Sequence, residues 1–163
     1  MEDLDEWHSL SGKQYLISIG VGVLTSVILS AIMVTALKIG VSPMPAPVSL
    51  VFAQTLFGTD LPLPVGLLFH VAWVTFWSVF YVVFFWEHLT LARATGLAVF
   101  LLALMFIVIF PFIGWGLFGM DVGPRAVVGG VVTHALFAIM LWALAYRTFG
   151  TQHEPAGQRL SHA

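Results

Sequence analysis

Two histidines are the side chains of this sequence best suited to chemistry inside a membrane. Each lies in a long apolar stretch and follows a glycine by one helical turn, in Gly66-Leu-Leu-Phe-His70 and in Gly130-Val-Val-Thr-His134. An imidazole can ligate a haem iron or a transition metal, pass protons, or form a single interhelical hydrogen bond. The sequence therefore gives His70 and His134 as candidate cofactor-binding residues, with a structural hydrogen bond as the alternative for each.

Haem is the candidate cofactor because it needs only two axial ligands. Two histidines alone make a poor metal site, since other metal ions require further ligands. The chain has no cysteine, which excludes disulfides, thiolate ligands and Cys nucleophiles. It has no Gly-x-Ser-x-Gly sequence and no phosphate-binding glycine loop, and we assign no catalytic residue.

The composition is that of an integral membrane protein. Of the 163 residues, 60% are hydrophobic and 9% are charged, whereas soluble domains are about 25% charged. So few polar groups cannot cover the surface of a soluble domain. The net charge is −2 and the sequence contains no basic run, so nucleic acid is not an expected partner.

Four long apolar stretches predict an all-α, polytopic fold with four transmembrane helices. A bilayer core requires roughly 20 helical residues. The expected domain covers residues 14–148, between a polar N-terminal tail (1–13) and a polar C-terminal tail (149–163). The predicted spans are residues 15–38, 65–86, 94–117 and 126–146.

Prolines shape the connections between these spans. Pro43, Pro45 and Pro47 cannot lie inside one continuous helix. A short apolar helix over residues 48–57 can follow them, and it is too short to span, so we expect an interfacial or re-entrant segment. Pro111 is expected to kink the third span or to end its regular part.

Small residues predict close helix packing. Gly22, Ser26 and Ser30 are four residues apart and share one helix face, where a neighbouring helix can approach closely. Gly66 and Gly130 clear space beside the two histidines, for a helix or for a planar ligand. The row on the first span motivates the expectation of a homo-oligomer, or of another membrane protein as partner.

Charges in the loops favour cytoplasmic termini and a location in the cell membrane. Four spans place both termini on one side, and that side holds more basic residues than the other. The acidic residues Asp60 and Asp121 each precede a His-bearing helix, where they either form an acidic mouth or complement the helix dipole. The basic residues are Lys13, Arg93, Arg147 and Arg159 on the terminal side, against Lys38 and Arg125 on the other.

The chain resembles a loose group of small prokaryotic integral membrane proteins. The resemblance covers roughly residues 15–148, and it is carried by the four spans, the proline-flanked helix 48–57, and His70 and His134 near the starts of the second and fourth helices. It implies a four-helix fold and assigns no activity.

Three functions are compatible with these features. The first is a small non-enzymatic membrane protein, acting as a subunit or as an oligomeric carrier or channel. The second is a haem-binding electron carrier with His70 and His134 as axial ligands. The third is a membrane-embedded enzyme acting on a lipid or quinone, which the sequence disfavours because it offers only the two histidines and two loop acids, Asp60 and Asp121, for such a reaction.

Overall fold

The computed structural model describes residues 10–150 and is helical, with no strand in this part of the chain. It confirms the predicted fold class, because four of its helices are long and apolar enough to cross a membrane and a shorter apolar helix accompanies them. Most of the two predicted polar tails lies outside the described residues. The spanning helices are α1 (Gly12–Lys38), α3 (Leu63–Phe84), the composite helix Leu91–Phe112 and α6 (Arg125–Phe149).

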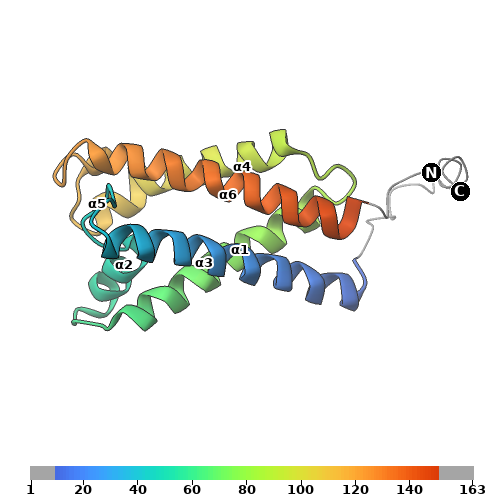
Figure 1. Cartoon of the computed structure of the whole chain (residues 1–163), viewed down its shortest axis with the longest axis horizontal. Coiled ribbons are helices and arrows are strands. Elements are labelled where there is room, and N and C mark those ends of the chain that lie inside the picture. The colour runs from blue at the N-terminus through green and yellow to red at the C-terminus, as the bar shows by residue number, and fades with distance from the viewer. Residues whose placement is uncertain (1–9, 151–163) are drawn as a thin grey trace, which may run out of the picture.

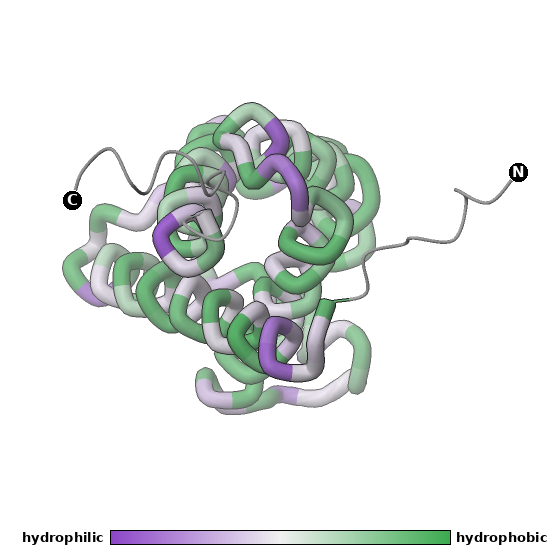
Figure 2. Tube along the Cα trace, turned by 90° about the vertical axis from the view of Figure 1, so that its right-hand side faces the viewer, coloured by the Kyte–Doolittle hydropathy of each residue, from purple (hydrophilic) through white to green (hydrophobic). Residues whose placement is uncertain are grey.

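The four spans form an antiparallel bundle in which α1 packs against both α3 and α6 (Figure 1). Helix α6 packs in turn against α4 (Leu91–Leu104), the first part of the third span. The described ends, Leu10 and Gly150, lie at the same end of the bundle. We call this end the terminal end and the opposite one the loop end. Seen along its axis, the bundle is apolar over most of the length of its helices (Figure 2).

The starts of two helices are fixed by local capping bonds. At α1 the hydroxyl of Ser11 accepts the backbone N–H of Gln14, while the side-chain carbonyl of Gln14 accepts the N–H of Ser11 at 2.7 Å. This reciprocal pair satisfies two N–H groups that otherwise have no partner in the helix. At α4 the hydroxyl of Thr90 accepts the N–H of Arg93. The third span therefore begins at Leu91, before the expected residue 94.

The third span ends with a π-helical turn and a proline. After α4 the chain forms η1 (Met105–Ile109), and the N–H of Phe110 donates to the carbonyl of Met105, five residues back. A wider turn here relieves the clash that a proline ring makes with the preceding turn. Pro111 follows in α5 (Phe110–Phe112), and the helix ends there rather than near residue 117. The helix stops at a left-handed turn, because Gly114 has a φ of 77°, its N–H donates to the carbonyl of Pro111, and the N–H of Trp115 donates to that of Phe110.

The short helix α2 (Val48–Phe57) lies against the loop end of α3 and is the expected non-spanning segment. It starts after Pro47 and ends at Gly58, whose φ of 65° is left-handed and suits glycine. Gly66 of α3 allows the contact, because a Cβ there would stand 2.7 Å from the Cα of Leu50. The backbones of α2 and α3 therefore meet almost directly.

At the terminal end, Tyr81 fastens the connection between α3 and α4. Its side chain is fully buried and its hydroxyl donates to the carbonyl of Thr90 at 2.9 Å. Arg93 completes this corner, with its guanidinium 5.3 Å from the ring centroid of Phe85. The tight turn between the two spans thus has both a partly buried hydrogen bond and a cation–π contact.

Replacing Tyr81 by phenylalanine is expected to cost about 0.5–1.5 kcal/mol of unfolding free energy, the usual value of one such bond. The carbonyl of Thr90 would lose the phenol and keep the N–H of Ala94 as its donor, while the packing of the ring stays. Unfolding in mixed detergent micelles measures the change. Tyr146→Phe is the matched control, because Tyr146 is exposed, and equal stabilities of the two variants would contradict the assignment.

Candidate functional site

His70 lies between α3 and α1, where two serine hydroxyls converge on one of its ring nitrogens. The Nδ1 atom is 2.8 Å from Oγ of Ser30 and 3.3 Å from Oγ of Ser26. The two serines are one helical turn apart and therefore share the face of α1 that meets α3. No hydrogen bond from another described residue reaches Nε2, the second ring nitrogen of His70. The imidazole is thus oriented through one nitrogen while the other stays available.

The two serines differ from most other hydroxyl groups of the spans. Ser18, Thr25 and Ser78 are buried, and each donates to the backbone carbonyl one turn earlier in its own helix. Such bonds are the ordinary way to satisfy a hydroxyl in an apolar helix. Ser26 and Ser30 instead bond to a side chain on another helix. Their contact with His70 therefore joins two spans through side chains.

The buried polar side chains of the described chain are confined to α1 and α3. Helices α4 and α6 contribute none. Gly22 brings the two helices together, because a Cβ there would stand 2.7 Å from the Cα of Thr75 and 3.1 Å from the Cβ of Ser78. We call this interface the α1–α3 seam and define it by Gly22, Ser26 and Ser30 of α1 and His70, Thr75 and Ser78 of α3.

One hydroxyl of the seam has no partner. The Oγ1 atom of Thr75 is buried and forms no hydrogen bond with any described residue. A buried polar group without a partner is costly, and native structures usually satisfy it, often with an ordered water. Thr75 lies five residues after His70 on α3, toward the terminal end. The seam therefore holds an unused hydrogen-bonding position beyond the histidine.

His134 has a different environment from His70. Its Nδ1 atom is 2.9 Å from the carbonyl oxygen of Gly130, one turn earlier on α6. A carbonyl only accepts, so Nδ1 carries the proton of this bond. Gly130 faces η1, because a Cβ there would stand 2.6 Å from Met105 and 2.7 Å from Phe106. The imidazole of His134 is thus fixed to its own helix, beside the third span.

The spaces beside the two glycines give no room for a haem, although Nε2 of each histidine, the nitrogen that ligates a metal when Nδ1 is hydrogen-bonded, has no described partner. The polar partner of His70 is on α1, whereas that of His134 is on α6 itself. The space that each glycine leaves is already filled by protein, at Gly66 by Leu50 and at Gly130 by Met105 and Phe106. Within residues 10–150 no group of three or more His, Cys, Asp or Glu side chains could hold a metal ion.

The structure also places the predicted row of small residues on α1 and the loop residue Asp121. Gly22, Ser26 and Ser30 contact α3 of the same chain, so this face of α1 is covered within one copy. Asp121 lies in the turn that follows α5, with its carboxylate packed on Gly116. The φ of Gly116 is 70°, which a side chain would disfavour.

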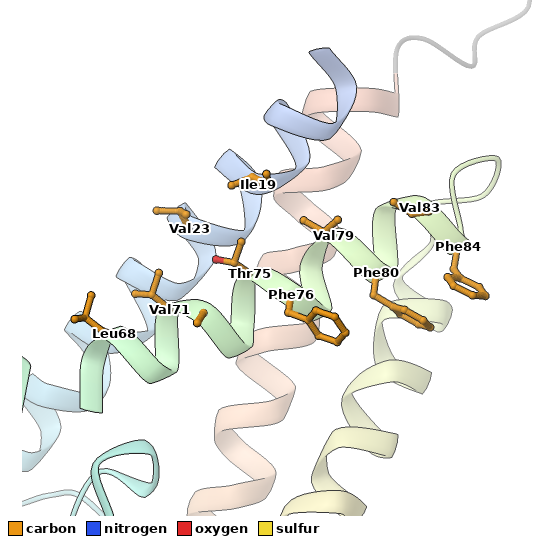
Figure 3. A pocket seen from close by; sticks show the side chains of 11 residues that line it. Ile19, Val23, Leu68, Val71, Thr75, Phe76, Val79, Phe80, Val83 and Phe84 are labelled. Atoms are coloured by element: carbon orange, nitrogen blue, oxygen red, sulfur yellow. The ribbon is translucent and has the colours of Figure 1, made fainter. Parts of the chain in front are cut away.

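A shallow apolar groove runs along the outer surface of α3 and α1 (Figure 3). Thr75 is the only polar residue among those that line it, and neither histidine is among them. Leu68, Phe76 and Phe84 border it and are more than half exposed. Such a surface suits hydrocarbon contact, and its one polar side chain, Thr75, belongs to the seam as well. The seam is therefore the candidate functional site.

Sequence reasoning identified His70 but assigned Ser26 and Ser30 to packing alone. The signal for their second role was the pair of hydroxyls one turn apart, on a face that also carries Gly22.

The sequence predicts that the hydroxyls of Thr75, Ser78 and Thr133 bond to their own helices. This is correct for Ser78 and Thr133 and wrong for Thr75, which has no described partner. Comparisons with protein families, with curated proteins and with solved structures found no match to this chain.

Proposed function

We propose that this chain is a non-enzymatic membrane protein that works as a carrier or channel subunit, with the α1–α3 seam as its polar site. The observation that supports this most strongly is the convergence of Ser26 and Ser30 on Nδ1 of His70. An ionisable side chain at depth in a bilayer is costly and marks a pathway for ions or substrates by default. His70 lies roughly 10 Å along α3, within the span.

The grouping of the buried polar side chains supports the same proposal. A structural role for His70 needs only one interhelical hydrogen bond, whereas two serine hydroxyls reach its Nδ1 atom. Here the polar groups gather at one interface, and one nitrogen of His70 and the hydroxyl of Thr75 have no described partner. A species that crosses or enters the membrane can use both positions. Association with further copies or with another membrane protein belongs to the proposal as well.

The experiment is a flux measurement on proteoliposomes with three probes: protons, potassium ions and glycerol. The wild-type protein is expected to raise the rate of at least one probe above that of protein-free liposomes. The double variant Ser26→Ala/Ser30→Ala is expected to lower that rate several-fold, because His70 loses both orienting hydroxyls. Thr133→Val is the matched control, since Thr133 bonds only to the carbonyl of Gly129 on α6.

Rates equal to those of protein-free liposomes for all three probes would count against a carrier or channel. A double variant that keeps the wild-type rate would remove the seam from the pathway. A comparable loss in Thr133→Val would mean that general damage to the bundle, rather than the seam, explains the effect.

A further inference from the structure

We propose that the species handled at the α1–α3 seam is the proton, with His70 as its binding group and Thr75 as the next position along the seam. This inference rests on the proposed function and names the substrate of the same site. It starts from the chemistry that the seam offers, which is one imidazole and several hydroxyls.

Charged partners are absent around His70 on the elements packed against it. The charged residues of α1 are Lys13 and Lys38, which lie at its two ends, and α2 has none. Within α3 the other titratable group is Tyr81, which bonds to Thr90 at the terminal end. An anionic solute would need a fixed cation, and a metal ion would need further ligands. A proton needs only the imidazole.

The imidazole can accept a proton at one nitrogen and release another from the second. The serine hydroxyls beside Nδ1 can donate to its lone pair, or they can accept from it when it carries a proton. When Nδ1 carries the ring proton, uptake of a second proton at Nε2 gives the imidazolium ion. The Nδ1 proton then passes to the oxygen of Ser30 while the hydroxyl proton of Ser30 leaves to a water molecule, and the ring is neutral again. N–H and O–H bonds form and break in equal number, and no electron is transferred. Ser26 and Ser30 thus serve the histidine in both of its states.

The unpartnered hydroxyl of Thr75 extends this polar path toward the terminal end. A buried hydroxyl without a partner is a position that a water molecule can satisfy. Ser78 follows on the same helix and faces the same glycine of α1. The distance from His70 to Ser78 along α3 is about 12 Å. A water at Thr75 would add one hydrogen-bonding position between the levels of His70 and Ser78 on α3.

Proton flux into proteoliposomes, driven by a potassium diffusion potential and followed with an enclosed pH-sensitive dye, tests this inference. The wild-type protein is expected to conduct protons. His70→Gln keeps a hydrogen-bonding group beside Ser30, but an amide does not bind a proton near neutral pH. The proton flux of this variant should therefore fall to that of protein-free liposomes. Thr75→Val removes one hydroxyl at nearly constant volume and should lower the flux several-fold, whereas Thr133→Val should not change it.

The outcomes separate this inference from the proposed function. A wild-type protein that passes potassium or glycerol but no protons would overturn the inference and leave a carrier or channel in place. The inference would also be overturned if His70→Gln or Thr75→Val conducted protons at the same rate as the wild-type protein. A wild-type protein that raises the flux of none of the three probes would contradict both the inference and the proposed function. Thermal unfolding of each variant, compared with the wild type, shows whether a lost flux reflects a lost fold.

Discussion

Replacing Gly22 by alanine is expected to destabilise the protein by about 1–3 kcal/mol, the usual cost of overpacking a tight interface. The added methyl group would stand 2.7 Å from the Cα of Thr75, so the backbones of α1 and α3 must separate. Separation would also lengthen the contacts of Ser26 and Ser30 with His70, and flux through the seam should fall with stability. Unfolding in mixed detergent micelles gives the free energy.

Gly20 provides the control for this substitution on the same helix. No atom lies within 4 Å of the place where its Cβ would stand, so Gly20→Ala should leave stability unchanged or raise it slightly, because alanine favours the helix. The reverse order, with Gly20→Ala the more destabilised variant, would show that α1 presents a different face to α3.

Replacing Gly66 by alanine is expected to displace α2 from α3. The loss of stability should be similar to that of Gly22→Ala. The new methyl group would meet three atoms of Leu50, among them its backbone nitrogen at 2.9 Å and its Cα at 2.7 Å. Since backbone atoms cannot rotate away, the short helix has to move as a unit. Gly96→Ala is the control, because Gly96 is helical and has open space around it.

Thiol labelling in detergent solution detects this displacement directly. The chain has no cysteine, so Ala53→Cys places a single thiol at a fully buried position of α2. The thiol should resist a maleimide in the otherwise wild-type chain and react in the Gly66→Ala background. Leu56→Cys, at an exposed position, should react in both. Continued protection of Cys at position 53 in the Gly66→Ala background would contradict the close contact between α2 and α3.

Much of the fold could be predicted from local patterns in the sequence. Apolar stretches of sufficient length gave the four spans, and Pro47 and Gly58 delimit the short helix where the sequence placed it. The limits of the third span were less predictable. Its start depends on the hydroxyl of Thr90, and its end depends on the left-handed turn at Gly114, which follows Pro111 by three residues.

The candidate site was predictable only in part, because helix order is not a local property. His70 stood out as an ionisable residue in an apolar span, and Ser26 and Ser30 stood out by spacing. That they meet follows from the packing of α1 on α3. His134 also follows a glycine by four residues, yet it bonds to its own helix, and its glycine faces the third span. The same Gly-xxx-His spacing therefore did not give the two histidines the same environment.

Nitrogen NMR of histidine-labelled protein in lipid bilayers tests the central claim most directly, by observing the Nδ1 signal of His70. The signal, assigned by its loss in His70→Gln, should show a hydrogen bond to a serine hydroxyl and should shift in Ser26→Ala/Ser30→Ala, while the signals of His134 stay unchanged. An Nδ1 signal of His70 that is the same with and without the two hydroxyls would contradict the proposed site.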